Sequence, residues 1–188
     1  MDAVIKRISE LDAAGSGATV VLLQSGATPS RIGQILARSF RVVRYAVAEV
    51  DAEQAGAAAA ELAAVIAARG PDPVGVIADA ASLSAALALV TARPELVRAL
   101  ALLAPPIPDQ APAEIKTPVL ALFGTRAMPA QVGRRMRAAI ANCNVVLVYD
   151  TDKDLATQRP EAVAAVLHEF MSAGDRFLVT GKSGKLYP

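Results

Sequence analysis

The fold of this chain is decided by the stretch from Val74 to Leu103, which reads VGVIADAASLSAALALVTARPELVRALALL. Val74–Asp79 is a short apolar run typical of a buried strand, and Ala80–Arg93 is rich in Ala and Leu, which favours a helix. Pro94 interrupts that helix, and Val97–Leu103 is a second apolar run. The stretch therefore predicts a strand, a sharp turn, a helix and another strand.

The same alternation of apolar runs and helix-like segments continues along the rest of the chain. The other expected strands are Thr19–Leu23, Arg41–Val47, Thr117–Phe123 and Val145–Tyr149, with a weaker edge strand or hairpin over Ala3–Leu11. The other expected helices are Arg31–Ser39, a long one capped by Asp51 and reaching Arg69, Pro129–Ala141 and Pro160–Ser172. This order predicts an α/β protein with a three-layer, doubly wound, mostly parallel sheet of about six parallel strands. We expect one domain over residues 1–175 and a separate C-terminal tail over 176–188.

Composition indicates which kinds of partner and which cellular location to expect. The chain has 188 residues and a net charge of +1, which argues against a nucleic-acid partner. No apolar run is long enough to cross a membrane, so we expect no membrane partner. The N-terminus shows no signal segment, and the single cysteine, Cys143, fits a reducing compartment, so the expected location is cytoplasmic.

Several segments resemble those of the α/β-hydrolase superfamily in their order and spacing. Arg93–Pro106 is similar to the segment that follows the nucleophile helix, Thr117–Gly124 to the strand before the catalytic acid, and Arg159–Val163 to the start of the last helix. The resemblance covers residues from about 15 to 175 and implies an α/β-hydrolase-like sheet. Members of this superfamily use a serine in a G-x-S-x-G elbow, an acid after a later strand and a histidine before the last helix.

The positions that the resemblance assigns to this catalytic triad carry other residues. The nucleophile position is Ala80, the acid position is Ala127 and the histidine position is Lys153. The oxyanion loop, usually His-Gly in the superfamily, reads Gln24-Ser25-Gly26, and Ile107–Lys116 leaves no room for a cap domain. The resemblance therefore implies a minimal, capless hydrolase core that lacks the triad.

Relocated chemistry is the alternative to a loss of catalysis. Asp79 could act as a shifted nucleophile, Ser25 lies at a strand end, and Lys153 could serve as the base for a serine. The simpler interpretation of Asp79 is a cap on the following helix. His168, the chain's one histidine, falls inside the last expected helix and is interpreted as an ordinary helix residue.

We expect no metal and no cofactor. Asp150, Asp152, Asp154 and Glu161 match the spacing of a calcium loop, but Leu155 stands where that loop needs glycine. The segment is therefore interpreted as a solvated loop at a strand end.

The tail contains residues suited to a protein contact. Phe177, Leu178 and Val179 form a strand-like run, and Leu186 and Tyr187 are further apolar residues close to the end. Because a missing cap also leaves apolar surface to be covered, we expect another protein chain as partner. The sequence thus predicts a non-catalytic structural or binding subunit of a homo- or hetero-oligomer. An esterase or lyase with relocated residues and a small-molecule binding protein are the alternatives.

Overall fold

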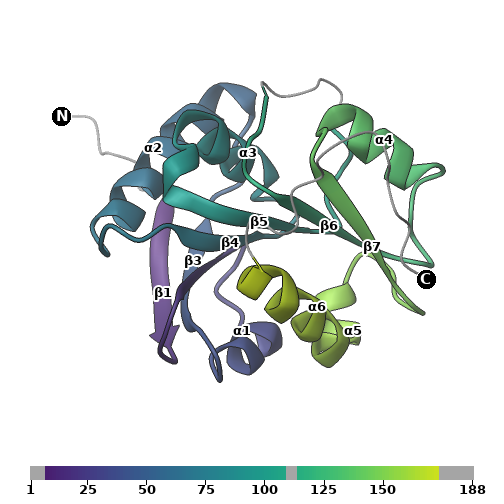
Figure 1. Cartoon of the computed structure of the whole chain (residues 1–188), viewed down its shortest axis with the longest axis horizontal. Coiled ribbons are helices and arrows are strands. Elements are labelled where there is room, and N and C mark those ends of the chain that lie inside the picture. Colours follow the sequence, from purple (N-terminus) through teal and green to yellow (C-terminus); the bar gives the residue numbers. More distant parts are fainter. Residues whose placement is uncertain (1–6, 109–113, 174–188) are drawn as a thin grey trace.

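The computed structural model describes residues 7–108 and 114–173, which form a seven-stranded sheet with helices on both faces (Figure 1). The strands, in chain order, are β1 (Ile8–Ala14), β2 (Thr19–Gln24), β3 (Arg41–Val47), β4 (Val74–Ala78), β5 (Val97–Leu103), β6 (Val119–Gly124) and β7 (Cys143–Val148). Their order in the sheet is β1-β3-β2-β4-β5-β6-β7. Strand β1 is antiparallel to β3, and the other six strands are parallel, which confirms the predicted mostly parallel sheet.

The helices divide between the two faces, so the predicted three-layer arrangement is confirmed. They are α1 (Arg31–Leu36), α2 (Ala52–Ala67), α3 (Leu83–Ala92), α4 (Val132–Ala139), α5 (Leu155–Gln158) and α6 (Pro160–Ala173), with a short 3₁₀ turn over Pro94–Leu96. Helices α2, α3 and α4 cover one face, and α1, α5 and α6 cover the other (Figure 1).

Each face of the sheet has its own hydrophobic core, because successive strand residues point to opposite sides. Val76 and Ala78 of β4 pack with α2 and α3, whereas Ile77 between them packs with α1 and α6. Since both faces are covered, the parallel strands read as continuous apolar runs instead of alternating ones. This is why the strands could be placed from sequence.

The turn between β4 and α3 differs from the prediction. Helix α3 begins at Leu83 and not at Ala80, so Ala80 and Ala81 lie in the turn and Ser82 takes the N-cap position. The side chain of Asp79 accepts a hydrogen bond from the N–H of Ser82 at 2.9 Å, so Asp79 closes the turn before the helix, while the N-cap of the helix itself is Ser82 and not Asp79. The turn thus places Ala80 beyond the carboxyl end of β4.

Smaller differences concern element boundaries. Strand β1 lies a few residues later than expected, and α4 starts at Val132 rather than at Pro129. Helix α5 was not predicted, because four residues are too few to show a helical period. The connection between β5 and β6 was expected on the surface, yet Pro105 and Ile115 within it are buried.

No cap domain separates β5 from β6. The connection over 104–118 contains neither a helix nor a strand in the part that the structure describes. Among the described residues, no helix has the length and hydropathy needed to span a membrane.

Candidate functional site

A cavity of about 220 Å³ lies beyond the carboxyl ends of the parallel strands. Its walls come from the loops that follow β4, β5, β6 and β7, which is where ligands bind in open α/β sheets. The lining residues are Ala80, Ala104, Pro105, Pro106, Phe123, Gly124, Ala127, Pro129, Asp152 and Lys153. Most of these side chains are apolar, so the cavity has hydrophobic walls with charged groups on one side only.

The three positions that the resemblance assigns to a triad all line this cavity. Ala80 follows β4, Ala127 follows β6 and Lys153 follows β7. Two of the three are therefore alanines, and the third is an exposed lysine. The fold brings these positions together, but they supply no hydroxyl, carboxylate or imidazole.

Close packing between two loops shapes one side of the cavity. A Cβ atom on Gly124, at the end of β6, would lie 2.3 Å from the carbonyl oxygens of Thr151 and Asp152. Only glycine allows this approach, because real Cβ atoms do not come so close to backbone oxygens. The loop that carries Lys153 is therefore held directly against the end of β6.

Asp79 connects the turn after β4 to the loop after β2. One carboxylate oxygen accepts from the N–H of Ser82, and the other accepts from the N–H of Ser25 at 2.7 Å. In α/β hydrolases a backbone N–H from this loop is one donor of the oxyanion hole. Here the N–H of Ser25 already has an acceptor, and that acceptor carries a negative charge.

The turn after β4 also lacks the backbone strain of a nucleophile elbow. The non-glycine residues with positive φ in the described part of the chain are Ala104 at 44°, Gln131 at 55° and Asp150 at 57°, so Ala80 is not among them. Ser82 is fully buried, and its hydroxyl finds no hydrogen-bond partner. Neither residue is arranged to expose a nucleophile.

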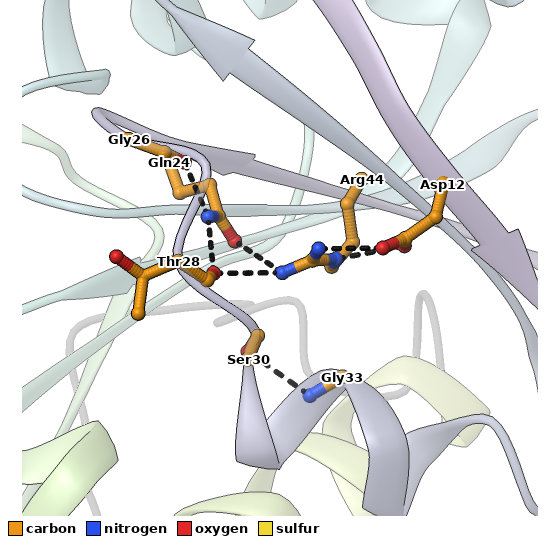
Figure 2. A network of polar contacts seen from close by, with 7 residues as sticks. All are labelled: Asp12, Gln24, Gly26, Thr28, Ser30, Gly33 and Arg44. Atoms are coloured by element: carbon orange, nitrogen blue, oxygen red, sulfur yellow. Dashed lines mark hydrogen bonds and ion pairs between the residues drawn. The ribbon is translucent and has the colours of Figure 1, made fainter.

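A buried arginine holds the loop after β2 in place (Figure 2). Arg44 of β3 donates from Nε and Nη2 to the two carboxylate oxygens of Asp12, at 2.7 and 2.5 Å. Its Nη1 donates to Gln24 Oε1 at 3.3 Å and to the carbonyl oxygen of Thr28 at 2.9 Å. Gln24 in turn donates to the carbonyl oxygens of Gly26 and Thr28. These bonds fix the loop from its sheet side, and hydrogen bonding from Arg44 lowers the pKa of Asp12.

The carboxylates that match the spacing of a calcium loop bind separate partners in the structure. Asp150 forms ion pairs with Arg126 and Arg159, and Glu161 of α6 pairs with Arg31 at 3.5 Å. Asp152 accepts from the N–H of Asp154 at 2.7 Å and from Gln158 Nε2 at 2.8 Å. These hydrogen bonds, the one from Asp154 above all, lower the pKa of Asp152. Within residues 7–108 and 114–173, no three His, Cys, Asp or Glu side chains gather as metal ligands would.

Other residues singled out from the sequence lie elsewhere. His168 is exposed on α6, with its ring centroid 5.3 Å from that of Phe40. Cys143 is buried in β7, and burial raises the pKa of its thiol to about 12. The five tail residues proposed for a contact, Phe177, Leu178, Val179, Leu186 and Tyr187, are outside the described residues.

Comparison with known proteins identifies the fold. No known protein-family profile matches the sequence, and no curated protein sequence matches it either. Similar solved structures include MGS-MChE2, an α/β hydrolase enzyme from a sediment metagenome of the Mar Chica lagoon, Morocco, with a TM-score of 0.70 and 15% identity over 90% of this chain and 96% of that one. Rv0554 from Mycobacterium tuberculosis has a TM-score of 0.70 and 17% identity over 89% of this chain and 94% of its own. The epoxide hydrolase CorEH has a TM-score of 0.70 and 13% identity over 88% of this chain and 99% of its own. The chain therefore has the α/β-hydrolase fold.

Sequence reasoning missed the contacts made by Asp79 and Arg44. Asp79 was predicted to cap the helix after β4, whereas its bond to Ser25 joins residues 54 positions apart and has no local signal in the sequence. Arg44 carried a signal that could have been used, since it is a charged residue inside the apolar run RVVRYAV. A charge in a covered parallel strand needs a partner, and Asp12 of the neighbouring strand provides it.

Proposed function

We propose that this chain is a non-catalytic α/β-hydrolase-like protein that acts as a binding subunit in an assembly with another protein chain. The observation that carries the proposal is the composition of the cavity: methyl groups at Ala80 and Ala127, and an amine at Lys153. Acyl transfer needs a nucleophile, a base and an oxyanion hole together. The residues that line the cavity do not provide a nucleophile, a base and an oxyanion hole together.

The two acids near the cavity support the same proposal. Both carboxylate oxygens of Asp79 accept backbone N–H groups, and both oxygens of Asp152 accept hydrogen bonds within its own loop. A carboxylate that accepts hydrogen bonds on both oxygens is a weaker nucleophile and base than a free one, because the donors stabilise its charge. Asp79 connects two loops, and Asp152 holds its own loop together.

The subunit role rests on the two edges of the sheet. Edge strand β1 has an irregular register between Glu10 and Asp12, and both side chains form ion pairs. Edge strand β7, with the sequence CNVVLV, has no charged residue. Leu147 is 45% exposed, and Tyr149 just beyond the strand is 77% exposed. Since proteins usually protect a sheet edge with charges or bulges, β7 is the edge suited to extension by another strand.

The tail supplies a segment of matching chemistry. The run Phe177-Leu178-Val179 is aromatic and aliphatic, as strands that add to an exposed edge are. In the proposed assembly this run, together with Leu186 and Tyr187, contacts a neighbouring chain, while residues 1–175 form the α/β domain.

Molar mass in solution tests the subunit role. Light scattering after size exclusion should give an oligomer, or a complex with a second chain, for the full-length protein. Leu147→Lys places a charge on the open edge and should shift the protein to the monomer, whereas Ala165→Lys on the exposed face of α6 should not. A full-length protein that is monomeric and without a partner would overturn the subunit role.

A further inference from the structure

The last helix, α6, brings the chain to the middle of the sheet just before the apolar tail run Phe177-Leu178-Val179. A Cβ atom on Gly75, the second residue of β4, would lie 2.5 Å from the sulfur of Met171 in the last turn of α6. The chain therefore leaves α6 over the amino end of β4, which is the middle strand of the seven.

Both edges of the chain's own sheet are too far from this point for the run to extend them. The position outside β7 is four strands away from β4, and so is the position outside β1. Neighbouring strands lie about 4.8 Å apart, which makes either distance roughly 19 Å. Phe177 is four residues beyond Ala173, and four extended residues span at most about 14 Å. An antiparallel strand outside β7 would have to start at the carboxyl end of β7, which is farther still.

The hand of the chain connections opposes the same pairing independently. The helical connections that move toward β7 cross the face of α2, α3 and α4, whereas the one from β2 to β3 moves toward β1 across the face of α1 (Figure 1). These four connections share one hand, as the right-handed rule for parallel strands requires. Helix α6 lies on the face of α1, so a parallel strand outside β7 in the same chain would need a left-handed crossover, which is nearly absent from proteins.

The outer side of β7 is nevertheless the edge that fits such a run. Among the described residues, no strand pairs with it. The part of β7 from Val145 to Val148 is aliphatic, and Leu147 within it is exposed. The opposite edge strand, β1, carries the ion-paired Glu10 and Asp12 instead. The run and the edge therefore match in chemistry, but they cannot meet within one chain.

We propose that the partner in the assembly is a second copy of this chain, and that the two copies exchange tails, so that each Phe177–Val179 run extends the other copy's sheet outside β7. The exchange rests on the proposed subunit role and names its partner. A reciprocal exchange closes a twofold dimer in which both open edges and both runs are covered. Direct pairing of β7 with the β7 of another copy would leave both runs without a strand to pair with.

Proline substitutions in the tail of the full-length protein test the exchange, because they do not touch the α/β domain. The N–H groups of adjacent strand residues point to opposite sides, so one of two neighbouring prolines must remove a bond to β7. The double variant Leu178→Pro/Val179→Pro should raise the dimer dissociation constant at least about ten-fold. The matched control Lys182→Pro/Ser183→Pro lies outside the run and should leave this constant unchanged. Sedimentation equilibrium over a dilution series measures both.

Crosslinking between introduced cysteines shows whether the contact joins two chains. Cys143 is buried, so the introduced thiols are the reactive ones. Leu147→Cys and Leu178→Cys are prepared separately, mixed to exchange subunits and treated with a short bis-maleimide. The mixture should give a covalent dimer that contains one copy of each variant, whereas each variant alone should stay a monomer on a denaturing gel.

Three results would overturn the exchange and leave the subunit role standing. These are a homodimer that survives Leu178→Pro/Val179→Pro, crosslinking of Leu147→Cys with itself, and a complex with a chain of different sequence in place of the homodimer. An internal crosslink within the double variant Leu147→Cys/Leu178→Cys would also overturn it, because the run would then reach its own sheet. A full-length protein that is monomeric and without a partner would overturn both the exchange and the subunit role.

Discussion

At the turn after β4, a single side chain, that of Asp79, connects two loops of this fold. Asp79 was expected to cap the following helix because it precedes a helix-like run, but it closes the turn through Ser82, which is the N-cap. Its second bond, to Ser25, could not be predicted, because it depends on the pairing of β2 with β4. The side chain that completes the turn is thus also the one that takes up the backbone donor of the loop after β2.

Two serines at helix N-cap positions are expected to contribute differently to stability. Ser30 accepts from the N–H of Gly33 at the start of α1, whereas the hydroxyl of Ser82 is buried without a partner. Ser30→Ala should lower the free energy of unfolding by about 1 kcal/mol. Ser82→Ala should leave it unchanged or raise it by about 1 kcal/mol, because an unsatisfied polar group is removed. Urea denaturation of both variants checks this, and a loss in Ser82→Ala as large as that in Ser30→Ala would contradict it.

Two arginines in the sheet, Arg44 and Arg98, allow a second comparison between a bonded and an unbonded side chain. Arg44 makes four hydrogen bonds in the network of Figure 2, whereas Nε and Nη2 of Arg98 are buried with no partner among the described residues. Burial lowers the pKa of Arg98, which reflects the cost of desolvating its charge.

We therefore expect opposite results from the same substitution at these two sites. Arg44→Met should lower the free energy of unfolding by about 2 kcal/mol, because Asp12 and the loop after β2 lose their donor. Arg98→Met should raise the melting temperature, because the methionine stem replaces an unpaired charge. Thermal unfolding followed by circular dichroism measures both, and equal destabilisation by the two substitutions would show that Arg98 has a partner of its own.

At the scale of elements, the buried strands were predictable and the short or exposed pieces were not. Strands β3 and β5 were placed with their observed bounds, because strands covered on both faces are mostly apolar despite the arginines they carry. Helix α3 begins three residues later than predicted. The first residues of the Ala-rich run have high helix propensity, but they form the turn that Asp79 closes. Helix propensity alone could not show how many residues the turn after β4 needs before the helix begins.

The position of Cys143 at the start of β7 predicts a stability change in alkali. Burial raises the pKa of this thiol from its ordinary value of 9.0 to about 12 in the folded protein. A raised folded-state pKa contributes stability that is complete below the unfolded-state pKa and is lost as the pH rises through the folded-state pKa. The free energy of unfolding should therefore fall between pH 9 and pH 12.

Cys143→Ala should remove this part of the alkaline dependence while lowering stability at neutral pH through the lost packing. Urea titrations of both proteins across that pH range provide the measurement. Parallel pH profiles for the native protein and Cys143→Ala would be inconsistent with a buried thiol.

At the scale of the whole molecule, the sequence predicted the architecture better than the site. The alternation of apolar and helical segments was sufficient for a parallel α/β sheet, and the order of local motifs indicated the α/β-hydrolase fold. Ala80, Ala127 and Lys153 could be named from the resemblance to the superfamily, but the cavity that they line became visible only with the loops in place. The bracing of those loops by Asp79, Arg44 and Gly124 depends on contacts between residues far apart in the chain.

The most direct test of a non-catalytic hydrolase fold is steady-state turnover of activated esters, such as the 4-nitrophenyl esters of short acids, by the purified full-length protein. The release of 4-nitrophenolate should equal that of Lys153→Met and of Lys116→Met at the same concentration, because no lining residue of the cavity acts as a nucleophile with a base. Saturable turnover by the native protein that is lost in Lys153→Met, or in Asp79→Asn or Ser25→Ala, and retained in Lys116→Met would contradict the account and assign the chain a relocated active site.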